Sequence, residues 1–148
     1  MFVLDTNVIS ELRHGKPSQS PEVRAWAAAQ PASQLYLSAI TLLELEMGVQ
    51  ALAFRTPPQG TALRRWLDGV KEAFAGRILP FTEHTAPLCA SLHIPDPRSE
   101  RDAMIAATAM EHGFTVVTRN VADFAHTGVA LINPWLGPAS APPLAPAR

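Results

Sequence analysis

The chain of 148 residues contains little cysteine and no long hydrophobic run. Its single cysteine, Cys89, excludes an intrachain disulfide and a cysteine-based zinc cluster, which agrees with a reducing compartment. No segment approaches the roughly 18 apolar residues that a membrane span needs, and no charged stretch followed by an apolar run indicates a secretory signal. We therefore expect a cytoplasmic protein without membrane contacts.

Several common functional signatures are also missing. The sequence has no GxGxxG, P-loop, HExxH or GxSxG motif, so the usual dinucleotide, NTPase, zincin and serine-hydrolase signatures are excluded. No sign of charge dominates, because 12 Lys and Arg face 13 Asp and Glu for a net charge of -1. A polybasic nucleic-acid coat is excluded. Any contact with nucleic acid must be local or bridged by metal cations.

What the sequence does contain is an alternation of short apolar segments with helical patterns, in a chain that is 47% hydrophobic and 17% charged. Strands are predicted at 2–4, 35–38, 78–79, 114–118 and 129–132, and helices at about 8–13, 41–54, 63–74, 83–92 and 99–112, with a further helix starting at Pro21 behind a Ser20 cap. This alternation is typical of a parallel sheet covered on both faces. The predicted fold is α/β, with a single domain and a mostly parallel central sheet flanked by helices.

The helix predicted at 63–74 has the clearest amphipathic pattern. Its apolar residues fall at helical spacing and should form a continuous buried stripe: Leu63, Trp66, Leu67, Val70 and Phe74. The opposite face carries Arg64, Arg65 and Lys71, which either line an RNA groove or form a solvated surface.

The end of the chain differs in composition. Proline and alanine dominate after Trp135, which predicts a folded domain at 1–135 and a disordered tail at 136–148.

Four acidic residues are predicted to meet at one edge of the sheet. Asp5 directly follows the first strand, and Asp123 comes shortly after the strand at 114–118. Glu44 and Asp102 are expected in the first turns of helices that begin at the same edge, where ligands bind in such folds. Alternatives exist for three of them. Glu44 and Asp102 also fit capping boxes behind Thr41 and Ser99, and Asp123 fits a turn.

Asp5 has no such alternative, because an isolated carboxylate beside a buried strand is costly unless it is paired or bound to a metal. Clustered carboxylates repel one another and need a counter-cation. Oxygen ligands favour Mg²⁺ or Mn²⁺, which can bridge to phosphate oxygens and activate water. The acids therefore predict hydrolysis of a phosphodiester, with the metal making RNA binding compatible with a net charge of -1.

The same segments resemble those of PIN-domain proteins of the VapC type, in particular the FitB-like subgroup. The resemblance covers residues 2–12 (FVLDTNVISEL), 37–48, 102–109 (DAMIAATA), 118–124 and the ending Asn133-Pro134-Trp135. The motifs occur in order along the chain, so the set is far more specific than any single piece. The Pro/Ala-rich tail is not part of the family pattern.

The resemblance implies a metal-dependent endoribonuclease that acts as the toxin of a toxin–antitoxin pair. It implies an acidic site of Asp5, Glu44, Asp102 and Asp123 that holds Mg²⁺ or Mn²⁺, with supporting or substrate-orienting groups at Thr6, Asn7, Thr118 and Asn120. Arg119 is a candidate contact for a phosphate or for an antitoxin carboxylate. A homodimer, an antitoxin of the ribbon-helix-helix type and indirect binding to operator DNA through that antitoxin are also implied.

Two other functions stay open from the sequence. A haloacid-dehalogenase-like phosphatase would use Asp5 as its nucleophile, but Asn7 stands where such enzymes usually have a second acid, and the only lysines are Lys16 and Lys71. A catalytically silent binding partner with the same fold is the other alternative, against which the complete set of four acids argues.

Overall fold

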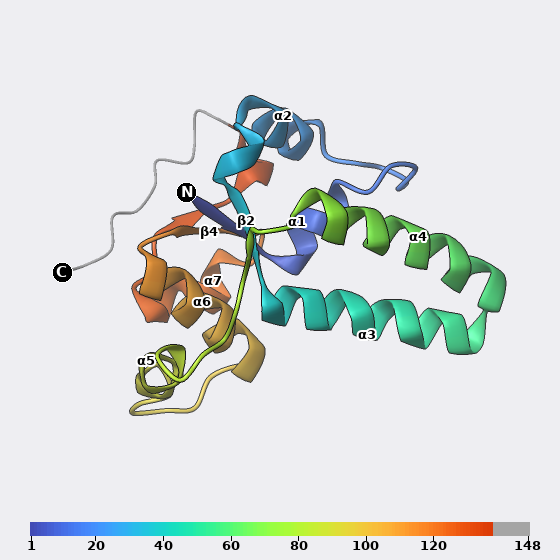
Figure 1. Ribbon diagram of the computed structural model, residues 1–148. Coiled ribbons are helices and arrows are strands. Elements are labelled where there is room, and N and C mark those ends of the chain that lie inside the picture. Colours follow the sequence, from blue (N-terminus) through green and yellow to red (C-terminus); the bar gives the residue numbers. More distant parts are fainter. Residues whose placement is uncertain (138–148) are drawn as a thin grey trace.

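The computed structural model describes residues 1–137, and its centre is a five-stranded sheet (Figure 1). The strands are β1 (Phe2–Leu4), β2 (Leu35–Ser38), β3 (Ile78–Leu79), β4 (Thr115–Val117) and β5 (Leu131–Ile132). They lie in the order β3-β2-β1-β4-β5, and each neighbouring pair is parallel. The register pairs Val3 of β1 with Tyr36 on one side and with Val116 on the other. The predicted α/β fold with a parallel sheet is confirmed.

Helices cover both faces of this sheet (Figure 1). They are α1 (Thr6–Glu11), α2 (Pro21–Ala29), α3 (Ala39–Arg55), α4 (Pro57–Ala73), α5 (Thr85–Ser91), α6 (Glu100–His112) and α7 (Val121–Phe124), with short 3-10 turns at Ala32–Gln34, Ala125–Thr127 and Pro134–Leu136. Leu136 thus closes a 3-10 turn, and the rest of the predicted tail, residues 138–148, lies outside the described residues. Within residues 1–137, no helix has the length and apolar character that crossing a bilayer requires.

The two layers of helices are held by alternate residues of the strands. In β1, Val3 packs with Ile105 and Phe124 on the α6–α7 side. The next residue, Leu4, packs on the opposite side with Val23 and Leu67. Successive side chains of a strand point to opposite faces, so a strand of three residues serves both halves of the core. This two-sided burial explains why the strands read as uninterrupted apolar runs.

Several predicted helix ends are confirmed. The Ser20 hydroxyl accepts a hydrogen bond from the Val23 N–H, and Pro21 opens α2. Gly113 ends α6 in the left-handed conformation at φ +69°, which a side chain with a Cβ would resist.

The start of α3 was predicted wrongly. The helix begins at Ala39 behind a Ser38 cap, whose hydroxyl accepts from the Thr41 N–H at 3.1 Å, and not at Thr41. Glu44 therefore lies in the second turn, and a capping box with Thr41 is excluded. The error arose because strand β2 runs into α3 without a turn residue, so the pattern gives no gap between them.

The start of α4 was also predicted wrongly. The preceding helix ends at Arg55, close to the predicted end, but α4 begins at Pro57 and not at Leu63, because Pro57 and Pro58 lie in its first turn, where a proline lacks only an N–H that the turn does not use. The apolar stripe of this helix is confirmed in part. Leu67 is fully buried, whereas Leu63, Trp66, Val70 and Phe74 are half-buried and pack against the core from its edge.

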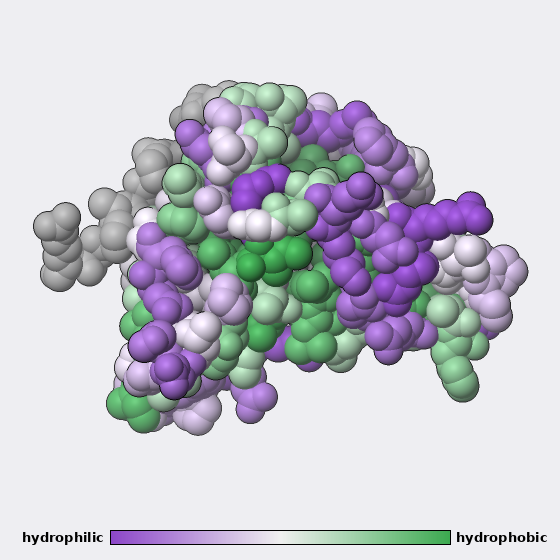
Figure 2. Space-filling view, viewed as in Figure 1, coloured by the Kyte–Doolittle hydropathy of each residue, from purple (hydrophilic) through white to green (hydrophobic). Residues whose placement is uncertain are grey.

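Helices α3 and α4 form an antiparallel pair that extends away from the sheet (Figure 1). The Arg64 guanidinium joins them by two hydrogen bonds of 2.7 Å to the Glu46 carboxylate, and Lys71 Nζ lies 3.4 Å from the same carboxylate. Figure 2 shows hydrophilic surface over α4 and apolar surface near the start of α3. Arg64 and Lys71 are thus engaged in packing two helices, which favours the solvated-face alternative for them over an RNA groove.

The Glu46–Arg64 pair predicts a pH dependence of stability. The hydrogen bonds from Arg64 hold the pKa of Glu46 at about 2, against 4.5 in an unfolded chain. A lowered folded pKa gives stability that is present above about pH 4.5 and is lost as the pH falls toward 2. After allowance for solvent screening of these partly exposed groups, Glu46→Gln should cost roughly 1–2 kcal/mol at pH 7.

Urea unfolding of the wild type and of Glu46→Gln at pH 7, 4.5 and 3 measures this difference. The difference in free energy of unfolding between the two proteins should decrease from pH 7 to pH 4.5 and again from pH 4.5 to pH 3. Glu72→Gln, on the exposed surface of α4, is the matched control and should stay within about 0.5 kcal/mol throughout. A gap that is the same at all three pH values would contradict the assignment.

Two glycines of α4 predict opposite effects of the same substitution. A Cβ at Gly60 would lie 2.7 Å from the Cβ of Ala53 on α3, so Gly60→Ala must push the two helices apart. At Gly69, nothing lies within 4 Å of an added Cβ. We expect Gly60→Ala to destabilise by roughly 1–3 kcal/mol and Gly69→Ala to stabilise by about 0.5–1 kcal/mol, measured by denaturant unfolding. Stabilisation by both would mean that the α3–α4 contact is loose.

Candidate functional site

The candidate site begins where two neighbouring strands end. Strand order reverses at β1, which has β2 on one side and β4 on the other, and the carboxyl edge beside such a reversal is where α/β sheets bind ligands. Asp5 directly follows β1, and Thr118 directly follows β4. The Asp5 N–H continues the sheet by donating to the Val117 carbonyl at 2.9 Å. The sheet itself therefore fixes the position of Asp5.

The Asp5 carboxylate is 5% exposed and is held by neighbours from both strand ends. One oxygen accepts from the Thr6 N–H at 2.8 Å. The other accepts from the Thr118 hydroxyl at 2.8 Å and from the Asn7 side-chain amide at 3.4 Å. Its orientation is thus set on both oxygens.

Thr6 links Asp5 to the second predicted acid. While its N–H binds Asp5, its hydroxyl donates to Glu44 Oε1 at 2.8 Å. The other oxygen of Glu44 accepts from Arg101 Nε at 3.2 Å. Glu44 of α3 is thereby held at the site between a residue of α1 and one of α6.

The two remaining acids lie on the α6–α7 side. Asp102 is half-buried in the first turn of α6, as predicted, and Asp123 is exposed on α7. The charges of Asp123 and Glu44 both act on Asp102, while those of Asp102 and Glu44 act on Asp5. The four acids form one electrostatic group, although they come from four separate elements.

Burial and mutual repulsion make two of these acids reluctant to ionise. Burial is the largest cause that raises the pKa of Asp5, and the charges of Asp102 and Glu44 add to it against the lowering effect of the Thr118 and Thr6 hydrogen bonds. Burial also raises the pKa of Asp102, opposed mainly by a hydrogen bond with the Ser99 side chain. A nearby cation would offset this cost.

The chemistry of these donors fits a hard cation. All are carboxylate oxygens, with no thiol or imidazole among them, which suits Mg²⁺ or Mn²⁺. Within residues 1–137, however, no three acidic, histidine or cysteine side chains converge closely enough to hold an ion by themselves. Mg²⁺ commonly binds through one or two carboxylates and completes its shell with water and substrate phosphate, so this donor set fits that mode.

The other predicted residues differ in how they join the site. Asn7 bridges the two strand ends, since its amide reaches Thr118 Oγ1 at 3.4 Å and its carbonyl accepts from the Arg119 N–H at 3.2 Å. Asn120 contributes its N–H, which donates to Thr118 Oγ1 at 3.0 Å. The Arg119 guanidinium lies 5.3 Å from the centre of the Trp135 ring. Its exposed side chain thus rests beside the site, on the ending of the domain.

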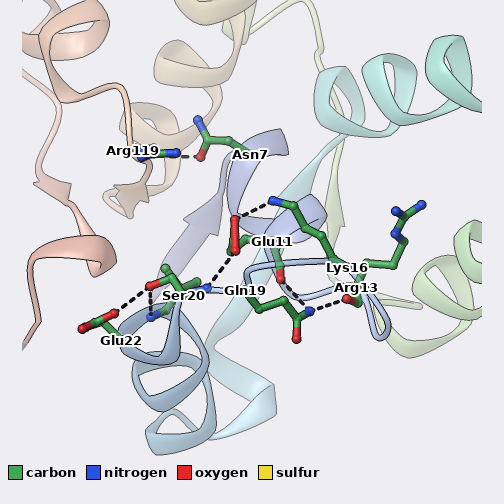
Figure 3. Close-up of polar contacts among 9 residues, drawn as sticks. Asn7, Glu11, Arg13, Lys16, Gln19, Ser20, Glu22 and Arg119 are labelled. Carbon is green, nitrogen blue, oxygen red and sulfur yellow. Dashed lines mark hydrogen bonds and ion pairs between the residues drawn. The ribbon is translucent and has the colours of Figure 1, made fainter.

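Two features of the site are not visible in the sequence. Arg101 pairs with Glu44 across 57 residues, and nothing in either segment indicates the pairing. The second is buried Glu11, whose carboxylate accepts from Lys16 Nζ at 2.6 Å and from the Ser20 N–H at 2.9 Å (Figure 3). Together with Gln19, which donates to the Glu11 and Arg13 carbonyls, it fixes the loop between α1 and α2.

With this geometry in place, comparison with known proteins identifies the family. The model of the PIN domain matches residues 2–129, and the chain belongs to this family. The VapC ribonuclease Y4jK of Sinorhizobium fredii is 43% identical over 144 residues, covering 91% of this chain and 98% of that protein. The toxin FitB of Neisseria gonorrhoeae is 39% identical over 140 residues, covering 91% and 99%.

Solved structures show the same likeness. The FitAcB complex from Neisseria gonorrhoeae contains a chain that is 38% identical, with a TM-score of 0.82 over 91% of this chain and 99% of the other. A FitAB complex bound to a DNA fragment gives a TM-score of 0.82 at 37% identity, covering 91% and 96%. The predicted membership of the PIN family and its FitB-like character are confirmed.

The raised pKa of Asp5 predicts that its charge destabilises the metal-free protein. A folded pKa above the unfolded value of 3.8 gives full stability below that value, which is lost as the pH rises through the folded pKa. In EDTA at pH 7.5, Asp5→Asn should therefore unfold at a higher denaturant concentration than the wild type. Its free energy of unfolding should be higher by about 1.4 kcal/mol for each unit by which the pKa of Asp5 is raised. At pH 4 the advantage should be much smaller.

The exposed Asp96 provides the control, because Asp96→Asn should leave the midpoint unchanged at both pH values. A less stable Asp5→Asn protein at pH 7.5 would mean that the hydrogen bonds to the carboxylate outweigh its burial.

Proposed function

We propose that this protein is a Mg²⁺- or Mn²⁺-dependent endoribonuclease and the toxin of a type II toxin–antitoxin system. The observation that carries the proposal is the buried Asp5 carboxylate, fixed by Thr6 and Thr118 beside the charges of Glu44 and Asp102. The relatives named VapC ribonuclease and toxin FitB, each matched over nearly its whole length, support it.

Each residue has a definite task in this proposal. Asp5, Glu44, Asp102 and Asp123 are the acids that would hold the cation, which supplies an activated water and charge neutralisation at the phosphate. Thr118 and Asn7 keep the Asp5 carboxylate in one orientation, and Thr6 sets the spacing between Asp5 and Glu44. Asn120 and Arg119, exposed at the rim, are placed to contact substrate, or an antitoxin carboxylate in the case of Arg119.

The proposed partners are a second copy of this chain and a small antitoxin of the ribbon-helix-helix type. Apolar side chains exposed along α3, at Leu43, Met47 and Phe54, supply surface for such association. The similarity to chains of FitAB complexes, one of them bound to DNA, supports an antitoxin partner and contact with operator DNA through it. The activity belongs in the cytoplasm, where the RNA is.

The two alternatives are less well supported. A phosphatase that uses Asp5 as nucleophile usually has a second acid two residues later, whereas this chain has Asn7 there, and its side-chain amide donates to the Asp5 carboxylate. A silent binding partner has no need of four acids whose charges oppose one another.

The test is cleavage of purified total RNA with Mg²⁺ or Mn²⁺ and with EDTA. The wild type should cleave only with the metal. Asp5→Asn should reduce the rate of cleavage by more than the 10- to 100-fold expected for Thr118→Val, because Thr118→Val removes only a supporting hydrogen bond. Asp96→Asn, away from the site, should cleave normally. Absence of cleavage by the wild type would favour the silent partner, whereas full activity of Asp5→Asn would refute the metal-ligand role.

A further inference from the structure

A groove runs from the acidic site outward between α1, α3 and α4. Two adjoining cavities of about 360 and 540 Å³ share Arg13, Leu63 and Trp66. The inner cavity also includes Thr6 and Glu44, and the outer cavity extends to Gln59 on α4. We call these six residues the α1–α3–α4 groove. It is continuous with the candidate site, because Thr6 and Glu44 belong to both.

Basic side chains line the groove beside the acidic residue that it shares with the candidate site. The loop after α1 brings Arg13, His14 and Lys16 to its rim. Lys16 is paired with Glu11, but within residues 1–137 no carboxylate pairs with the Arg13 guanidinium, which lies 6.0 Å from the centre of the Trp66 ring. Figure 3 shows the Arg13 side chain pointing away from the Glu11 contacts that fix its backbone.

The buried Glu11 fixes the conformation of the loop that carries these basic residues. Its carboxylate binds the middle of the loop through Lys16 and the end of the loop through the Ser20 N–H, and the Gln19 side chain donates to the Arg13 carbonyl, so the Arg13 backbone is held in place before any ligand arrives. A charge held in position loses less entropy on binding than one on a free loop.

We propose that the α1–α3–α4 groove binds the single-stranded RNA that leads away from the cleaved phosphate, with a base stacked at Trp66 and a phosphate at Arg13. This inference rests on the proposed ribonuclease function. An aromatic ring beside an unpaired guanidinium is a combination that holds single strands without sequence preference.

Charge and continuity favour RNA over an acidic peptide as the occupant. A substrate longer than a few nucleotides must leave the acidic site along some surface, and this groove shares Thr6 and Glu44 with that site. The cations on α4 do not compete for this role, because Arg64 and Lys71 are paired with Glu46 and Arg65 lines neither cavity. Arg13 is the unpaired cation that lines both cavities.

The test is single-turnover cleavage of an unstructured 12-nucleotide RNA, with Mg²⁺, as the protein concentration is varied. Arg13→Gln should raise the half-saturating concentration about 5- to 10-fold and leave the maximal rate within about twofold. The salt dependence of RNA binding by Arg13→Gln should also weaken. The slope of log K against log salt should become shallower by about 0.7, as expected for one lost phosphate contact.

Trp66→Leu should raise the half-saturating concentration by about fivefold or more with the salt slope unchanged, and Trp66→Phe should retain most of the binding. Thermal unfolding checks that each variant is folded, and Arg13→Gln still tests the groove if Trp66→Leu does not fold. Arg65→Gln, an exposed charge on the same helix outside the groove, is the matched control and should bind as the wild type does.

The possible results separate this proposal from the proposed function. Wild-type cleavage with unchanged half-saturation in Arg13→Gln and in Trp66→Leu refutes the groove alone, as does an equal loss in Arg65→Gln. Normal RNA binding together with loss of antitoxin co-purification would assign the groove to a protein and also refute it. No cleavage by the wild type refutes the ribonuclease function, and the groove proposal falls with it.

Discussion

The burial of the Asp5 carboxylate is the constraint on which the rest of the site depends. The sheet places this residue one position beyond β1, where the chain is still bonded to β4 through the Asp5 N–H. A carboxylate so placed must be given hydrogen bonds, and Thr6, Asn7 and Thr118 supply them. These bonds lower the pKa of Asp5, but burial outweighs them. Hydrogen bonds thus fix the orientation of the carboxylate, but they do not offset the cost of burying its charge. A bound cation offsets that cost.

The same constraint explains why Glu44 is held from two sides. While the Thr6 N–H donates to Asp5, the Thr6 hydroxyl points toward α3 and donates to Glu44. Arg101 then balances part of the charge of Glu44. Asp5 and Glu44 therefore each have partners that fix their positions, while the group of four acids keeps more negative charge than the one ion pair with Arg101 neutralises. Electrostatic repulsion that would destabilise an ordinary core is here confined to one edge of the sheet.

The sequence predicts the parts of this arrangement that follow from strand ends. Asp5 could be placed because a buried apolar run stops directly before it, and Asp102 because Ser99 marks the start of α6, whereas Thr118, counted within its predicted strand, was expected at the site only from the resemblance. Glu44 was expected at the right edge for a partly wrong reason, since α3 begins two residues earlier than its pattern indicates. The Glu44–Arg101 and Glu46–Arg64 pairs could not be predicted, because they depend on how separate helices lie against one another. The same is true of the groove, whose walls come from three helices.

The near-neutral net charge conceals a strong local separation of charges. On α3, Glu46 faces α4 and is neutralised by Arg64 and Lys71, while Glu44, two residues earlier, points toward the acidic site. A two-residue spacing on a helix puts these side chains on different faces, so one helix both stabilises its partner and adds charge to the site. Arg13, for which residues 1–137 offer no carboxylate partner, lines the same groove as Glu44 and continues along it into the second cavity. Negative charge at the acidic site with positive charge beside it along the groove is the distribution that suits a polyanion reaching that site together with a divalent ion.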